Sequence, residues 1–318
     1  MITNHHEQHF GLPPFDFPRH DAEIPAELPD PASVAWRIVV DSYESEESWP
    51  EAFARFRGAV DIGQVRALVV GSWSDPYENG PQDVIETLCS VREEMPELRS
   101  LFLGDISSEE CEISWITQGS VAPLLEAFPR LTEFIVRGGT SLDFAPVRHE
   151  SLRKLVIESG GLPRGVVRGV AESDFPALEC LDLWLGTSQY GGDSEVSHLA
   201  PILAGTRLPA LWALSLRNSE IQDEIAAAAA MAPVVARLKV LDMSMGTLGN
   251  EGAAALLSGQ PLTHLKVLDL NHNYLSEEMR DRLRKALEPA GVELDLDGDD
   301  AEEDDEDDEV WRYVAVSE

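Results

Sequence analysis

Side chains that often bind metal ions stand at alternate positions in one segment near the end of the chain. Asp269, Asn271 and Asn273 have the spacing of the first ligands in a calcium-binding loop. Such a loop also needs a glycine at its sixth position and a glutamate at its twelfth, where this chain has Tyr274 and Arg280. The spacing therefore indicates something other than calcium binding, and a sequence repeat explains it better.

A second group of candidate ligands is the set of three histidines near the N-terminus, His5, His6 and His9. Imidazoles bind zinc, copper and nickel in principle. The surrounding segment, MITNHHEQHF, is polar and shows no helical or strand pattern. We therefore expect a mobile terminus here and no metal site.

Short motifs of the common enzyme classes are missing from the chain. No G-x-x-x-x-G-K-[ST], H-E-x-x-H or G-x-S-x-G occurs. Ser151 and Lys154 have the Ser-x-x-Lys spacing of penicillin-binding enzymes, but they overlap a repeat strand and lack the companion motifs. We expect a protein that is not an enzyme and that uses no cofactor.

The charge of the chain limits its partners. It has 318 residues with 24 Lys and Arg against 58 Asp and Glu, a net charge of −34. Nucleic acids and anionic membranes would repel such a chain, so neither is expected as a partner. The run 297–309 holds 11 acidic residues, which leaves −34 + 11 = −23 for the rest. A basic or neutral protein partner remains open.

Cysteine content and hydropathy indicate the compartment. The three cysteines are too few and too scattered for a disulfide framework. The N-terminus has no apolar segment of the kind that signal peptides carry, and the longest apolar run, 225–236, is too short to span a bilayer. We expect a cytoplasmic protein that is monomeric on its own.

The strongest pattern is a repeat. Leu265, Leu268, Leu270, Asn273 and Leu275 fit L-x-x-L-x-L-x-x-N-x-L at every defining position. Looser copies in the same frame precede it, with first positions at Val65, Leu98, Leu131, Leu152, Leu178, Leu211 and Leu238. The eight first positions span 200 residues, a mean of 28–29 residues per repeat.

Each repeat needs a strand and a crossover. Its L-x-L core is a short strand that buries one face and must stack on a parallel neighbour. A parallel ladder needs a crossover of a dozen or more residues, which the amphipathic segments between the copies supply as helices. Asn273 is expected to satisfy backbone groups where its strand turns into a loop.

On these residues the chain resembles a known family. Residues 65–290, above all LKVLDMSMGTLGNEGAAALLSG and LKVLDLNHNYLSEE, are similar to leucine-rich-repeat proteins of the ribonuclease-inhibitor-like subtype. The resemblance implies an α/β solenoid, a horseshoe with a parallel concave sheet and convex helices, of about 8 repeats plus terminal caps. GLPPFDF at 11–17 and RYVAVSE at 312–318 also resemble the ends of a bacterial leucine-rich-repeat family with no established activity.

Repeat alignment places two columns of side chains on the concave face. Solenoids of this kind commonly bind partners there. The expected partner-binding residues are Val69, Phe102, Ile135, Arg137, Val156, Glu158, Asp182, Trp184, Arg217, Asp242, Asp269 and Asn271. The first half of this set is largely apolar and the second half is polar and acidic.

The two halves suggest different uses. Contiguous exposed Val, Phe and Ile usually mark an interface, unless the N-terminal arm covers them with Phe10, Phe15 or Phe17. Asp242 and Asp269 should lie on strands about 4.8 Å apart, where like charges favour a basic partner group or a raised pKa. A solvated face with an incidental Asp pair is the plain alternative.

The ends are expected to differ from the repeats. We predict an extended arm at 1–33, an α/β cap at 34–64 and the solenoid at 65–296. A disordered acidic loop at 297–309 and a C-terminal strand at 310–318 should follow, the strand capping the solenoid edge or docking a partner.

These features favour a non-catalytic module that binds a protein partner on its concave face. One alternative is an acidic inhibitor or masking protein for a basic enzyme such as a nuclease. Another is an accessory scaffold subunit of an enzyme complex. The sequence does not separate the three.

Overall fold

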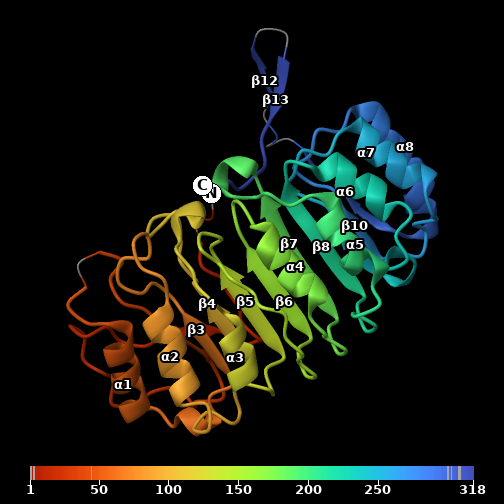
Figure 1. Ribbon diagram of the computed structural model, residues 1–318. Helices are drawn as coiled ribbons and strands as arrows, with labels where there is room; N and C mark the ends of the chain where they lie inside the picture. Colours follow the sequence, from red (N-terminus) through yellow and green to blue (C-terminus); the bar gives the residue numbers. More distant parts are fainter. Residues whose placement is uncertain (1, 3, 44, 299–300, 302, 307–308) are drawn as a thin grey trace. The chain divides into compact units, whose positions relative to one another are not determined.

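The fold is an α/β arrangement of parallel strands and helices that alternate along the chain (Figure 1). The computed structural model describes residues 2, 4–43, 45–298, 301, 303–306 and 309–318. The chain divides into two compact units, residues 1–158 and 159–317, a boundary that falls inside the predicted solenoid. Each unit is described by itself.

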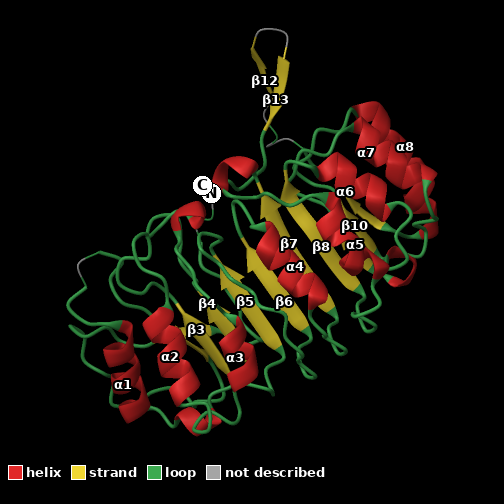
Figure 2. Ribbon diagram, in the orientation of Figure 1, coloured by secondary structure: helices red, strands yellow, loops and turns green. Residues whose placement is uncertain are grey.

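The first unit has six parallel strands that pair in chain order. They are β1 (Pro14–Asp16), β2 (Ala35–Ile38), β3 (Ala67–Val70), β4 (Ser100–Leu103), β5 (Glu133–Arg137) and β6 (Lys154–Glu158). The helices are α1 (Trp49–Ala59), α2 (Gln82–Ser90) and α3 (Ala122–Ala127). Figure 2 shows these helices on one face of the strands.

Strands and helices of the first unit meet through the repeat leucines. Leu68, Leu101 and Phe134 are fully buried and stand in register on β3, β4 and β5. Successive strand residues point to opposite faces, so these three face the helices while their neighbours face away. The expected helix at the start of the unit is α1, and both Phe53 and Phe56 are buried in it.

The second unit repeats the plan. Its parallel strands are β7 (Cys180–Gly186), β8 (Ala213–Ser219), β9 (Val240–Asp242), β10 (Val267–Asp269) and β11 (Glu293–Asp295). The helices are α4 (Arg164–Glu172), α5 (Val196–Ala204), α6 (Gln222–Ala229), α7 (Asn250–Ser258) and α8 (Glu277–Leu287).

The repeat asparagine has the expected role. The side-chain oxygen of Asn273 accepts a hydrogen bond from the Leu248 backbone N–H at 3.0 Å. Its amide donates to the carbonyl oxygens of Met243, at 2.9 Å, and Leu270, at 3.0 Å. Because buried backbone groups must find partners, this one side chain stabilises the turn that leaves β10.

The acidic run departs from the expected disordered loop. Residues 303–306 form strand β12 (Glu303–Glu306), which pairs antiparallel with β13 (Glu309–Arg312) in a hairpin. Residues 299, 300, 302, 307 and 308 of the run lie outside the described residues. The sequence from β13 onward contains β-branched and aromatic residues, which favour extended backbone. This extended segment is the strand with which β12 pairs.

The end of the chain crosses the ends of strands instead of pairing with the β11 edge. Its backbone binds Tyr274 and Met245 in the loops after β10 and β9, and Asn218 near the end of β8. The Tyr313 N–H donates to the Tyr274 hydroxyl at 2.9 Å, and the Ala315 N–H to the Met245 carbonyl at 2.9 Å. The Val316 N–H donates to the Asn218 side chain at 2.9 Å. The C-terminal segment therefore closes the unit along its strand ends.

Candidate partner-binding surface

The strand register puts the predicted columns together within each unit. In the first unit Val69, Phe102, Ile135 and Val156 are consecutive Cα partners on β3 to β6, and Arg137 is the partner of Glu158. In the second unit Asp182 aligns with Ser215, then with Asp242 and Asp269, and Trp184 aligns with Arg217. These rows lie on the strand face away from the helices.

The apolar row of the first unit is not an open surface. The exposed fractions of Val69, Phe102, Ile135 and Val156 are 0%, 0%, 2% and 5%. Phe10 and Leu12 of the N-terminal arm pack against this cluster, which also includes Ala35 and Ala67. The arm therefore covers the row that was expected to be exposed, which was the alternative the sequence left open.

The arm uses its aromatic residues in two places. Phe10 lies on the apolar row, as the sequence suggested for all three phenylalanines. Phe15 instead packs on Trp36 with ring centroids 5.2 Å apart, and Phe17 on Phe56 at 5.3 Å. These two residues therefore contribute to the core at the start of the unit.

Arg137 and Glu158 form a buried ion pair. Arg137 Nε donates to Glu158 Oε2 at 2.7 Å, and the two residues are 1% and 3% exposed. Burial by itself would raise the pKa of Glu158, but the charge of Arg137 and the hydrogen bond from His6 outweigh it and hold the pKa at about 2. Neither side chain is available to a partner in this structure.

Asp105 completes this cluster and was missed at the sequence level. It is fully buried, 3.2 Å from Arg37 Nε and 3.6 Å from Arg137 Nη1. Burial opposes its ionisation, but His5, Arg137 and Arg37 together lower its pKa. One feature of the sequence marks Asp105: it is an aspartate two residues after β4, at a repeat position where the other copies have no charged residue.

The N-terminal histidines lie against this cluster, contrary to the expected mobile terminus. His6 Nε2 is 3.1 Å from Glu158 Oε1, and His5 Nδ1 is 3.4 Å from Asp105 Oδ2. Among the residues that the structure describes, no group of three or more His, Cys, Asp or Glu is arranged to hold a metal ion. The histidines contact carboxylates in this arrangement.

In the second unit Arg217 joins two of the predicted carboxylates. It binds Asp182 with two hydrogen bonds, Nε to Oδ1 at 3.0 Å and Nη2 to Oδ2 at 2.7 Å. Its Nη1 lies 3.6 Å from Asp242 Oδ2, and its guanidinium carbon lies 4.8 Å from the ring centre of Trp184. The planar guanidinium suits both contacts, which a lysine would not reproduce.

The acidic row continues one strand beyond the predicted residues, onto β11. Asp242, Asp269 and Asp295 are Cα partners on β9, β10 and β11. Over the described part of the chain, no Lys or Arg pairs with Asp269 or Asp295. Strand β11 lies at the end of the predicted solenoid, 65–296, outside the eight repeat copies from which the columns were aligned.

Asp269 is the most perturbed carboxylate of this row. Its pKa is raised to about 6, first by burial and then by the charges of Asp242 and Asp295. Asn271 opposes the shift, because its backbone N–H donates to Asp269 Oδ1 at 3.0 Å and its side-chain amide at 2.8 Å. Asn271 therefore orients Asp269 and leaves the other carboxylate oxygen for another contact.

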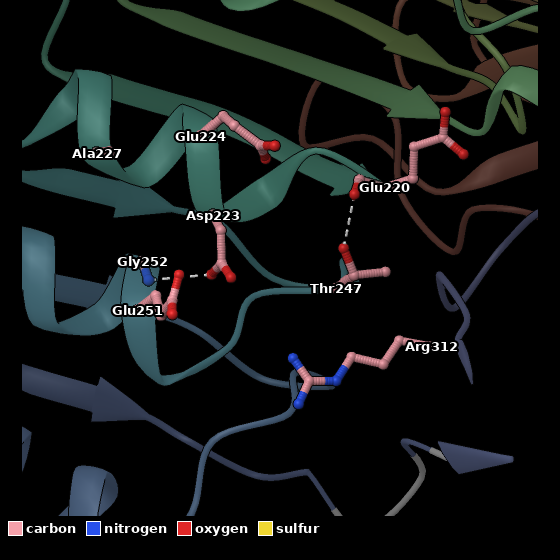
Figure 3. Close-up of a pocket in the computed structure, with 8 residues that line it drawn as sticks. All are labelled: Glu220, Asp223, Glu224, Ala227, Thr247, Glu251, Gly252 and Arg312. Carbon is pink, nitrogen blue, oxygen red and sulfur yellow. Dashed lines mark hydrogen bonds between the residues drawn. The ribbon is translucent and has the colours of Figure 1, made fainter. Parts of the chain in front are cut away.

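A separate hollow of about 640 Å³ lies beside α6 and α7 (Figure 3). Glu220, Asp223, Glu224 and Glu251 line it, with Arg312 at one side. Asp223 Oδ1 accepts from the Gly249 N–H at 2.7 Å and the Gly252 N–H at 3.1 Å. This aspartate therefore caps the N-terminus of α7, which is a structural use of the charge.

Comparisons with known proteins bear on the architecture. A crystal structure of a protein from Bacteroides fragilis matches with a TM-score of 0.69 and 31% sequence identity, over 75% of this chain and 67% of that one. The chain belongs to the same family as that protein. No family model and no curated protein matches the chain. The shared fold therefore comes without an assigned activity.

The helices also bear on membrane association. Among the described residues, none of the helices is long and apolar enough to cross a bilayer. This agrees with the absence of a long apolar run in the sequence.

Proposed function

We propose that the chain is a non-catalytic binding module that recognises a basic group of a protein partner at Asp242, Asp269 and Asp295. The solenoid would be of the leucine-rich-repeat, ribonuclease-inhibitor-like kind. The alternating strands and helices, the parallel register of the strands in each unit and the role of Asn273 support that finer assignment.

One observation carries the functional proposal: among the described residues, Asp269 has a raised pKa and no Lys or Arg within ion-pair distance. A raised pKa means that ionised Asp269 destabilises the folded chain. Residues that lower stability without a compensating contact are characteristic of functional sites. A lysine or arginine from a partner would supply the missing charge.

The geometry suits a planar cation. Asp242 and Asp269 stand on strands about 4.8 Å apart, close enough for one guanidinium to reach both carboxylates. Arg217 already shows this arrangement one step along the row, where it lies between Asp182 and Asp242. A partner arginine would repeat that pattern between Asp242, Asp269 and Asp295.

Binding should therefore depend on pH, and its salt dependence should separate the module from the inhibitor, because a partly buried ion pair is screened less than exposed charges. The partner cation needs ionised Asp269, so affinity should rise as the pH rises through about 6. An inhibitor that masks a basic enzyme by long-range attraction would lose affinity steeply between about 0.05 and 0.5 M salt, because exposed charges are screened there. A nearly salt-independent affinity would leave the simple module and exclude the inhibitor.

The test is affinity purification from native cells with three baits. We expect wild type and the control Asp21→Asn, an exposed aspartate of the first unit, to capture the same partner. The double variant Asp269→Asn/Asp295→Asn should bind it at least tenfold more weakly in a titration with the purified partner. Equal affinity of all three baits would overturn the proposal.

A further inference from the structure

The N-terminal segment 5–12 is held against the first unit by its side chains. His9, Phe10 and Leu12 contact or cover the apolar row, and His9 is 1% exposed. Within the described residues, the backbone of this segment makes hydrogen bonds only inside its own turn, between His9 and Leu12. We call residues 5–12 the strap. The described backbone of the strap makes no hydrogen bonds to the sheet, so the strap does not extend the sheet and contacts it through side chains, as a bound peptide would.

The groove beneath the strap is complete without it. Its floor is Val69, Phe102, Ile135 and Val156, which come from strands that pair with one another. At one end Arg37 and Arg137 contact Asp105, and Arg137 also contacts Glu158. The strap therefore adds no missing strand, and both of these carboxylates keep an arginine partner without it.

The strap itself shows what the groove accepts. Phe10 lies against the floor, and Arg66 lies over its ring at 5.2 Å from the centre. Leu12 packs against the same cluster two residues later. The positive φ of Phe10 (55°) and Gly11 (69°) forms the tight turn that presents both side chains. The fitting sequence is thus an aromatic residue, a glycine and an aliphatic residue.

One strap residue is poorly suited to permanent burial. Among the residues that the structure describes, none hydrogen-bonds to either ring nitrogen of His9. The ring lies between His6, at 5.5 Å, and Phe102, at 5.4 Å between ring centroids. A leucine would fill this place without leaving polar atoms unsatisfied. Burial lowers the pKa of His9 to about 4, against the opposing charge of Asp105.

We propose that the strap is a displaceable internal ligand and that the groove beneath it binds a turn-forming segment of a partner protein, which presents an aromatic and an aliphatic residue at the spacing of Phe10 and Leu12. The proposal concerns a different surface from the acidic row. Either can fail without the other.

Acid should open the strap. A buried histidine with a lowered pKa keeps the strap in place above about pH 6.5, and that stabilisation is lost as the pH falls toward 4. Between pH 7.5 and pH 5 the open fraction should rise roughly 30-fold from this group. Other charged groups surround the strap. His5 and His6 contact carboxylates of the first unit, which also bind arginines: Asp105, Glu110 and Glu158, with Arg37 and Arg137. The charge of Glu133 raises the pKa of His9 and the charge of Lys154 lowers it.

The probe is a fluorescent peptide of residues 4–13 that carries His9→Leu. It keeps His5 and His6, so strap and peptide offer the same histidine contacts to Asp105 and Glu158, whereas the strap alone carries His9. With the full-length wild-type chain we expect weak binding at pH 7.5 and roughly 30-fold tighter binding at pH 5. The full-length variant His9→Leu should bind weakly at both values, and the control His20→Gln should behave like wild type.

A second variant tests the groove at constant pH. The full-length double variant Phe10→Ala/Leu12→Ala should bind the peptide at least tenfold more tightly than wild type at pH 7.5. A peptide with the same two replacements should not bind. Bound peptide should slow amide hydrogen exchange in β3, β4 and β5.

Three results would overturn the proposal. The first is equal peptide affinity of wild type at both pH values. The second is no binding to the folded double variant, with circular dichroism as the check on folding. The third is a dimer of the wild-type chain at pH 5 that does not exchange with peptide, since the groove would then belong to a second copy.

Discussion

In the first unit the row through Phe102 is apolar, fully buried and covered by the chain's own N-terminus. The corresponding row of the second unit consists of Ser215 and four aspartates, and Asp269 lies there with a raised pKa. In the first unit the buried charges are balanced by Arg37 and Arg137, whereas in the second unit Arg217 serves only part of the row. One strand position is thus used for internal packing in one unit and left charged in the other.

The difference shows that the repeat determines the direction of a side chain but not the residues that it contacts. Both rows face away from the helices at the same place in the repeat. In the first unit a segment from far along the chain fills the space in front of the row. The C-terminal segment of the second unit instead binds Asn218 near the end of β8 and Met245 and Tyr274 in the loops after β9 and β10. These hydrogen bonds lie outside the acidic row, in which Asp182 and Asp242 are buried by other contacts.

The largest effect is expected at the buried ion pair of the first unit. Arg137→Ala would leave Asp105 and Glu158 without their shared cation, which should lower the free energy of unfolding by about 3–5 kcal/mol. Denaturant unfolding at pH 7 would measure it. Arg148→Ala, which breaks an exposed pair with Glu150, is the matched control and should cost less than about 1 kcal/mol. Similar costs for both would mean that the network is not a buried unit.

The second effect is expected where the C-terminal segment of the second unit is attached. Asn218 is fully buried and has a φ of 53°; it accepts from Val316 N–H and donates to Val316 O at 2.6 Å. Asn218→Ala should cost about 2–3 kcal/mol through lost hydrogen bonds and the left-handed backbone. Asn218→Gly keeps the backbone conformation and separates the two causes. Equal stability of wild type and both variants in thermal melts would contradict this attachment.

The third effect is expected at the cation that serves the acidic row. Arg217→Ala should lower stability by about 1–2 kcal/mol, because Asp182 and Asp242 lose their partner. Since the charge of Arg217 lowers the pKa of Asp269, that pKa should also rise further. Carboxyl carbon shifts followed by NMR titration would report it. Arg217→Lys should keep the pKa and lose the two-point contact; a pKa change in Arg217→Lys but not in Arg217→Ala would refute this account.

The smallest effect has the opposite sign. Asp269→Asn should stabilise the chain by about 1–2 kcal/mol at pH 8, after solvent screening of the shift is allowed for. The folded pKa of about 6 lies above the unfolded value of 3.8, so the penalty is absent below pH 3.8 and grows as the pH rises through 6. Melts of wild type and variant should therefore converge at pH 4.

Asp281→Asn, on an exposed face of α8, is the control for that gain. It should leave stability nearly unchanged at either pH. If Asp269→Asn destabilises at pH 8, the aspartate has a structural partner and the proposed site loses its main support.

Regular spacing made much of this fold predictable. The leucine pattern located β3 to β10 and the two side-chain columns, because a period of two decides which residues share a face. The capping asparagine Asn273 followed from the same pattern. Asp269 was predicted as a candidate because the repeat alignment places it beside Asp242 on the neighbouring strand, which the register confirms.

Contacts without periodicity were not predictable. His9 and Phe10 are positioned by contacts with residues far away in the chain, and no local sequence pattern predicts such contacts. Asp105 lies outside the repeat columns, so alignment did not select it. The β12–β13 hairpin was missed because a run of like charge by itself favours disorder.

Synthesis from the N-terminus gives the strap an unusual history. His6 and its partner Glu158 are separated by 152 residues, so the first segment to leave the ribosome is among the last of its unit to find a seat. At roughly 5–20 residues per second, the strap would wait without its partners for about 8–30 seconds. During that interval chaperones and neighbouring nascent chains meet the same aromatic and aliphatic side chains that the finished protein conceals.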